Sequence, residues 1–154
     1  MSKKIEFSIA DHAQLRPAPI NPEWIIEGAP FARNALLSKS ADDSAFTLVW
    51  DCTRGLFDWH YSIDETVFIL EGSVMVEDEA GVIRVLEAGA TAFFPAGSRA
   101  RWRVETYVRK VAFCRKPMPR GYVFARDVAK AALEKFGFRK PGSANDMEMF
   151  SVAS

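Results

Sequence analysis

The side chains most able to do chemistry gather in one short stretch, Gly55 to Gly72, which reads GLFDWHYSIDETVFILEG. It holds His60, one of only two histidines in the chain, together with Asp58 and Glu65. Imidazole and carboxylate groups together bind divalent ions such as Mn, Fe, Ni or Zn. The stretch could be half of a metal site, or a pair of strands that kept the shape of such a site and lost its chemistry.

Glu65 opens an otherwise apolar run, TVFIL, so an inward-facing carboxylate there would need a partner. The candidate partners are Lys110, Arg101 and Arg103. Lys110 interrupts the apolar run YVRKVAFC. Two arrangements remain open, a Glu65–Lys110 pair inside a cavity or a solvated pair at its rim. A lysine beside a carboxylate could bind an anionic or carbonyl ligand, or serve as a general acid.

The run RARWRVE alternates Arg99, Arg101 and Arg103 on one face with apolar residues, among them Trp102, on the other. Three arginines on one strand face could hold a carboxylate or a phosphate. More often such arginines solvate an outer face, and that interpretation points Trp102 into the interior. Other catalytic patterns are absent from the sequence, including a nucleophile elbow beside a histidine, a phosphate-binding glycine loop and zinc-finger spacing.

Length and composition predict one folded domain. The chain has 154 residues, of which 49% are hydrophobic, which suffices for a single core. Lys plus Arg equals Asp plus Glu at 20 each, so the charge favours neither nucleic acid nor an anionic membrane as a partner. No apolar run approaches the roughly 20 residues that span a bilayer. The N-terminus lacks the apolar core of a signal peptide, so we expect a cytoplasmic protein, with Cys52 and Cys114 as reduced core thiols.

The elements that must position these side chains fall into three zones. Residues 1–44 are broken by prolines and predict an extended arm, with ARNALLSKS as a possible short strand. Residues 45–116 read as strand after strand, typical of an antiparallel sandwich or barrel. The expected turns lie at Gly72, Gly81, Gly89 and Pro95–Gly97, and the first of them closes a hairpin at Glu71-Gly72-Ser73.

Residues 117–154 change character. The segment YVFARDVAKAALEKFG carries an apolar stripe at helical spacing, which predicts one amphipathic helix. We expect Gly137 to cap its C-terminus and the helix to pack on the barrel or on a partner subunit. The last residues, SANDMEMFSVAS, are expected to form a loose tail.

Two spaced motifs resemble those of the cupin family. The first cupin motif ends in a glutamate, six residues and a glycine, and Glu65 and Gly72 fit this spacing. The second contains a glycine, five residues and Pro-x-Gly, and Gly89 and Pro95–Gly97 fit. Over about residues 46–116 the chain resembles the cupin branch related to the ureidoglycine aminohydrolase cupin domain and to the ethanolamine-utilisation protein EutQ.

The resemblance implies an all-β fold, a cupin barrel of the double-stranded β-helix or jelly-roll type. Together with the three zones of the chain, it predicts a cupin barrel over residues 45–116, an N-terminal arm over residues 1–44 and a C-terminal helix and tail over residues 117–154.

The resemblance also implies a degenerate metal site. A typical cupin site has three histidines and a carboxylate. Counting four residues back from Glu65 puts His60 and Asp58 at the two histidine positions of the first motif, and Ala100 stands at the histidine position of the second. His60, Glu65 and Asp58 remain the candidate metal ligands, for at most an adventitious ion. We expect no cofactor, and a divalent metal (Mn, Fe, Ni or Zn) is kept as the alternative.

Strand alternation leaves two choices for the stretch 57–61, because a slip of one residue turns every side chain to the other face. A loop of four residues before Glu65 points Asp58 and His60 into the barrel. A loop one residue shorter points Trp59 and Tyr61 inward, and burial of large aromatics favours this arrangement. The candidate ligand-binding residues are Trp59, Tyr61, Glu65, Trp102 and Lys110.

Two classes of function follow. The first is a single-domain cupin that binds a small planar or carboxylated molecule without a metal and has an accessory or sensor role in small-metabolite metabolism. The second, implied by the resemblance, is a metal-assisted enzyme acting on a small nitrogenous or carboxylated metabolite, as ureidoglycine aminohydrolase does. The sequence also predicts a homodimer, because exposed sheet edges need cover and the arm segment NPEWIIEG is apolar.

Overall fold

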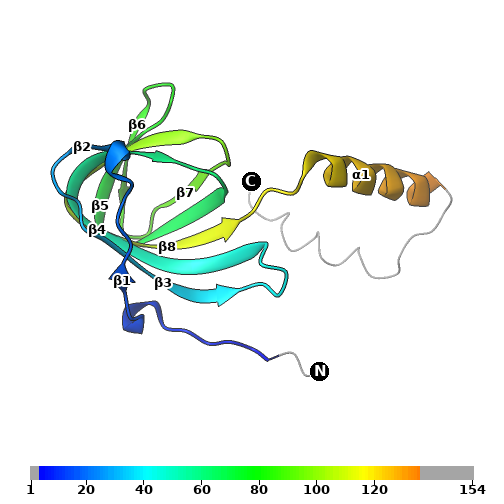
Figure 1. Cartoon of the computed structure of the whole chain (residues 1–154), viewed down its shortest axis with the longest axis horizontal. Coiled ribbons are helices and arrows are strands. Elements are labelled where there is room, and N and C mark those ends of the chain that lie inside the picture. The colour runs from blue at the N-terminus through cyan, green and yellow to red at the C-terminus, as the bar shows by residue number, and fades with distance from the viewer. Residues whose placement is uncertain (1–3, 136–154) are drawn as a thin grey trace. The chain divides into compact units, whose positions relative to one another are not determined.

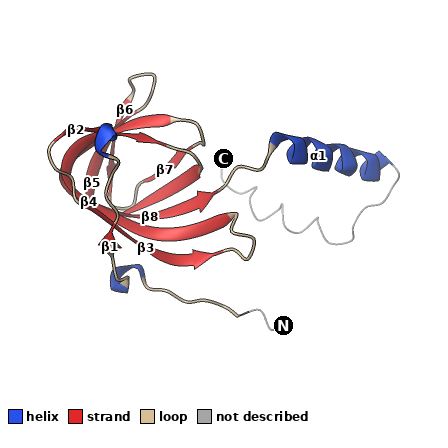
Figure 2. Ribbon diagram, in the orientation of Figure 1, coloured by secondary structure: helices blue, strands red, loops and turns tan. Residues whose placement is uncertain are grey.

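The computed structural model of the chain describes residues 4–135 (Figures 1 and 2). The chain divides into two compact units, Met1–Pro117 and Met118–Ser154. No helix in the described part is long and apolar enough to cross a membrane.

The first unit is an antiparallel sheet that curls around a common interior (Figure 1). Its order is β1-β3-β4-β8-β5-β6, with β2 beside β4 and β7 beside β5. The predicted all-β antiparallel barrel is confirmed, and no helix connects its strands within residues 45–115. The strands are β1 (Arg16–Pro17), β2 (Ile25–Glu27), β3 (Ala32–Lys39), β4 (Ala45–His60), β5 (Asp64–Glu77), β6 (Ile83–Glu87), β7 (Thr91–Phe94) and β8 (Arg99–Arg115), and two 3-10 turns, η1 (Ala10–His12) and η2 (Pro22–Trp24), lie in the arm.

Three long strands build most of the barrel. β8 lies between β4 and β5 and pairs with both along nearly its whole length. Each long strand bends at an irregular register, for example between Thr53 and Gly55 in β4. The segments that the sequence presents as separate short strands, such as FTLVWDC and FDWHY, are therefore halves of one bent strand.

Gly72 does not close the predicted hairpin; that prediction is wrong. β5 runs without reversal from Asp64 to Glu77, and Gly72 is a bulge inside it with φ of 72°. A Cβ at this position would lie 2.0 Å from the Tyr107 carbonyl oxygen. Glycine is needed here because the left-handed backbone and the close approach of the paired strand β8 exclude a side chain. The other predicted turns, at Gly81, Gly89 and Gly97, lie between strands and have positive φ.

The N-terminal arm lies on its own barrel. β2 pairs with β4, and Trp24 and Ile25 pack against the core. β3 pairs with β4 from Ala32 to Lys39, so the sheet starts before residue 45. The apolar strip NPEWIIEG thus has a place within its own domain, which removes the reason to expect it to cover a neighbouring barrel.

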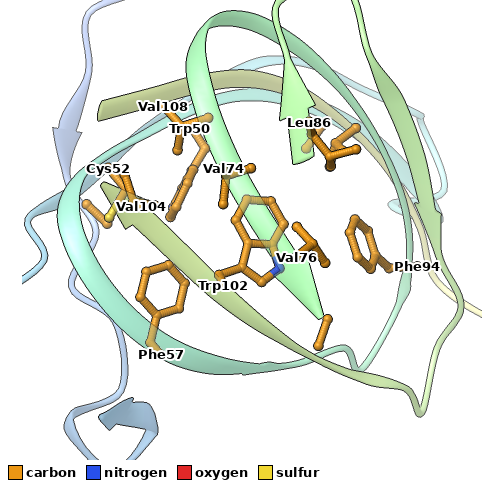
Figure 3. Close-up of a cluster of buried hydrophobic side chains, with 14 of the residues drawn as sticks. Trp50, Cys52, Phe57, Val74, Val76, Leu86, Phe94, Trp102, Val104 and Val108 are labelled. Carbon is orange, nitrogen blue, oxygen red and sulfur yellow. The ribbon is translucent and has the colours of Figure 1, made fainter. Parts of the chain in front are cut away.

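The interior of the barrel is a single apolar cluster. Buried and more exposed side chains alternate along much of β5 and β8, as the period of two in the sequence predicts, whereas Val49–Cys52 of β4 are buried on both faces. Figure 3 shows Trp102 amid this cluster with Trp50, Phe57 and Phe94 around it. The ring centroid of Trp102 lies 5.8–6.4 Å from those three rings, distances at which aromatic pairs attract.

The second unit contains α1 (Arg120–Lys135), close to the helix expected from the apolar stripe. Its first turn carries no acidic residue, and Lys135 lies in the last turn, where a cation interacts favourably with the helix dipole. The predicted cap Gly137 and the tail lie outside the described residues.

Both cysteines are free and buried, as expected. Cys52 faces the barrel interior from β4 and Cys114 faces it from β8. Burial, with smaller contributions from neighbouring charges, raises the pKa of each thiol to about 12 from an ordinary value of 9.0.

These thiols predict a loss of stability in alkali. Because the folded-state pKa is raised, the stability that the neutral thiols contribute is fully present below pH 9 and is lost as the pH rises toward 12. The free energy of unfolding, measured by urea denaturation, should fall between pH 9 and pH 10. The double variant Cys52→Ala/Cys114→Ala should show a shallower fall over this interval. Equal slopes in the two proteins would contradict the prediction.

Candidate functional site

An ion pair lies inside the barrel. Lys110 of β8 donates a hydrogen bond from Nζ to Oε1 of Glu65 on β5, at 2.5 Å. Lys110 and Glu65 are only 5% and 7% exposed. Of the two arrangements that the sequence leaves open, the buried pair is the one formed, because both side chains lie on the inner face of their strands.

Two indole rings complete the surroundings of the Lys110 ammonium. Its Nζ lies 4.9 Å from the ring centroid of Trp50 and 4.7 Å from that of Trp102. A cation at this distance from an indole face is attracted by the negative charge above the ring. The burial of a charged lysine is thus offset by one carboxylate and two aromatic faces.

Tyr61 belongs to the same network. Its hydroxyl accepts a hydrogen bond from Nε1 of Trp102 at 3.0 Å, and its ring stacks on Phe94. Burial first, and then the negative charge of Glu65, raise the pKa of Tyr61 well above its ordinary value. The phenol is therefore neutral at physiological pH and keeps a proton that it can donate.

The stretch 57–61 turns its aromatics inward. Phe57 and Tyr61 are buried, and Trp59 packs against the core, whereas Asp58 is half-buried and His60 is exposed. The pairing of β4 with β8, in which Trp59 is opposite Ala100, decides which side chains of this stretch face inward. The shorter of the two loops is the one present, so three residues separate Tyr61 from Glu65.

Asp58 and His60 are consequently not at metal-ligand positions. Asp58 accepts two hydrogen bonds from Arg101, at 2.8 and 3.2 Å, and this contact lowers the pKa of the carboxyl group. The imidazole ring of His60 lies 5.0 Å from the Trp24 ring of the arm. Glu65 points to the opposite face, so the three candidate metal ligands are not brought together.

The donor set does not fit the metal that the fold family implies. The positions facing the interior at the two motifs hold Trp59, Tyr61, Glu65 and Ala100, of which only Glu65 is an ordinary ligand for a divalent ion. Within residues 4–135, no three His, Cys, Asp or Glu side chains converge.

The three arginines of β8 lie on the outer face. Arg101 pairs with Asp58, and Arg103 lies 3.9 Å from a carboxylate oxygen of Glu27. Trp102 points inward between them and is 2% exposed. The structure therefore brings together four of the five candidate ligand-binding residues, Tyr61, Glu65, Trp102 and Lys110, while Trp59 packs against Trp50 at the side of the cluster.

A second buried carboxylate was missed from the sequence. Asp51 is 1% exposed and accepts hydrogen bonds from two guanidinium nitrogens of Arg33 and from the Tyr107 hydroxyl. It lies on the outer face of β4, beneath the arm, where Arg109 donates to the Ala10 carbonyl. The signal was the single charge inside the buried run LVWDC, which needed a partner just as Glu65 did.

A groove of about 550 Å³ lies at the strand ends, and neither Glu65 nor Lys110 lines it. Its wall includes Cys114, which faces the interior and is paired in register with Glu65. The ion pair of Asp64 with Arg115 lies at its edge. Phe46, Phe93 and Phe113 supply apolar wall.

Residues 39–112 match the family model described as the EutQ-like cupin domain. A protein of unknown function from Pseudomonas syringae pv. tomato has 28% sequence identity and a TM-score of 0.62, over 67% of this chain and 45% of that one. No match was found among the curated proteins.

Two solved EutQ structures share the fold. The Clostridium difficile EutQ protein has 18% identity and a TM-score of 0.50, over 56% of this chain and 64% of that one. A putative ethanolamine utilization protein EutQ from Salmonella typhimurium has 20% identity and a TM-score of 0.51, over 68% and 95%. The chain thus spans less than two thirds of the length of the Pseudomonas and Clostridium proteins.

Proposed function

Because residues 39–112 match the EutQ-like cupin domain, we propose that the protein is a small-molecule-binding cupin that works without a metal ion and holds its ligand through the Lys110–Glu65 pair. Its role is accessory or sensory, in the metabolism of a small planar or carboxylated compound in the cytoplasm.

The buried ion pair carries this proposal. An ion pair in a dry interior stabilises a fold little compared with apolar residues of the same size, so its presence in the centre of a core is typical of a functional site. The ammonium group of Lys110 has three N–H donors, and Glu65 accepts from one of them. The other two remain able to bind a ligand carboxylate. The indole rings of Trp50 and Trp102 offer flat faces for a planar molecule.

We propose that the ligand enters through the groove that Cys114 lines. The pair itself is closed in by its neighbours, so a ligand must separate side chains at one end of the barrel to reach it. One wall residue, Cys114, is the register partner of Glu65, and the wall is mostly apolar with hydroxyl groups from Thr47 and Thr66.

The alternative, a metal-assisted enzyme on a small nitrogenous or carboxylated metabolite, requires a divalent ion bound through His60. Elemental analysis of protein purified without added metal separates the two functions. Stoichiometric manganese, iron, nickel or zinc that is lost in His60→Ala would overturn the proposal in favour of the enzyme.

Glu65→Gln tests the ligand-binding role directly. The change removes the carboxylate that competes for Lys110, so small carboxylates should bind the variant about tenfold more tightly than the wild type. The measurement is a thermal-shift titration with acetate and benzoate, each compared with its neutral amide. Glu71→Gln, an exposed change on the same strand, is the matched control and should behave as the wild type.

Two results would contradict the ligand-binding role. One is an equal response to each carboxylate and its amide. The other is an equal carboxylate affinity in Glu65→Gln and Glu71→Gln.

We also propose that the protein is a homodimer. Three phenylalanines on the outer face of β5, β7 and β8 support this, because Phe68, Phe93 and Phe113 are 39%, 61% and 52% exposed. Thr66 pairs with both Phe93 and Phe113, so the three rings form one apolar patch. Light scattering at micromolar concentration should give twice the chain mass of 17.2 kDa, and Phe93→Glu should reduce it to one chain.

A further inference from the structure

We propose that the barrel interior is an ammonium-binding cage, and that the chain fills this cage with its own Lys110 and not with a metal ion. This inference concerns what occupies the interior in the resting protein. It does not depend on whether a small molecule binds there.

The cage has the groups that recognise an ammonium ion. Glu65 supplies one anionic acceptor at 2.5 Å from Nζ. The ring centroids of Trp50 and Trp102 lie 4.9 and 4.7 Å from the same nitrogen. Indole faces beside a carboxylate are the typical recognition elements for ammonium groups in proteins.

The same groups are poor ligands for a divalent ion. One carboxylate offers too few donors, and the remaining interior positions of the motifs present an indole, a phenol and a methyl group from Trp59, Tyr61 and Ala100. A single positive charge balances the single charge of Glu65, whereas a divalent ion would leave an excess charge in a dry interior.

The tether makes this cation a permanent part of the fold. Lys110 lies on β8, where it is opposite Trp50 of β4 and Ile69 of β5. The pairing of these three strands therefore places Nζ in the cage whenever the barrel is folded. No equilibrium with free cation in solution is needed, because the tether gives the ammonium group a high effective concentration.

The test is chemical rescue of Lys110→Ala. This variant lacks the chain from Cγ to Nζ, which n-propylammonium matches in length and charge. We expect the variant to lose about 10–20 °C in Tm, and n-propylammonium to recover part of the loss. Binding of n-propylammonium to the variant should be about tenfold tighter than binding of neutral 1-propanol.

The double variant Lys110→Ala/Glu65→Gln is the matched control. It keeps the cavity and the two indole faces but removes the carboxylate, so the preference for n-propylammonium over 1-propanol should be much smaller than in the single variant. Equal stabilisation of the single variant by the two compounds would mean that they only fill space, and would overturn the inference. So would a folded single variant that neither compound stabilises, or a stoichiometric metal ion in the wild type.

A measurement on the wild type decides the matter if Lys110→Ala does not fold. The ammonium protons of Lys110 should give a slowly exchanging NMR signal that is shifted upfield by the two indole rings. This signal should disappear in Lys110→Arg and move in Glu65→Gln. A spectrum in which no lysine ammonium signal is shifted or protected would overturn the inference.

Discussion

Replacing Lys110 with methionine is expected to lower the free energy of unfolding by about 3–5 kcal/mol, the usual loss when one partner of a buried ion pair is removed. Methionine is close to lysine in length and fills the same space. The loss therefore comes from Glu65, which stays in the interior without a cation. Urea denaturation at pH 7 measures the change.

Two further variants make this result specific. Lys116→Met removes an exposed lysine just after β8 and should change stability by less than about 0.5 kcal/mol. Adding Glu65→Gln to Lys110→Met should recover part of the loss, because the double variant buries no unpaired charge. Losses that simply add in the double variant would show that the two residues do not interact.

Replacing Gly72 with alanine is expected to cost about 3–5 kcal/mol, from two effects that act together. The left-handed backbone, with φ of 72°, disfavours any residue with a Cβ by about 1–2 kcal/mol. The new Cβ would also meet the Tyr107 carbonyl oxygen at 2.0 Å, so β5 and β8 must move apart at this point of their pairing. Thermal or urea unfolding of the purified variant gives the value.

Gly89→Ala separates these two effects. Its φ of 92° is as unfavourable as that of Gly72, but nothing lies within 4 Å of the new Cβ. This variant should therefore lose only the backbone part, about 1–2 kcal/mol. Equal losses at Gly72 and Gly89 would mean that the contact between β5 and β8 at Gly72 adds nothing to the cost.

The strand pattern and the spaced motifs were enough to predict the barrel and its family. A side chain's face in a strand depends on its position alone, so the alternation of VRKVAFC already put Lys110 with Cys114 on one face of β8. The glycines and prolines that separate the strands carried the family spacing. These are local properties, and a sequence displays them directly.

Other features depended on pairing between distant segments. The sequence did not decide which side chains of Phe57 to Tyr61 face inward, because either set agrees with strand alternation. Only its pairing with β8, more than 40 residues away, turned Tyr61 inward and Asp58 out to Arg101. Gly72 looked like a hairpin turn for a similar reason, since a bulge and a turn need the same left-handed glycine.

By itself, then, the sequence determined the all-β barrel, the two spaced motifs and the absence of histidine from two of their three expected positions. Only the tertiary structure decided that Glu65 and Lys110 meet inside, that Trp50 and Trp102 enclose the ammonium group, and that Arg33 pairs with Asp51 on the outer face. The physical reason is that a buried charge requires a partner without specifying which one. The partner is selected by the register of strands that are far apart in the chain, through hydrogen bonds that form only when the barrel closes.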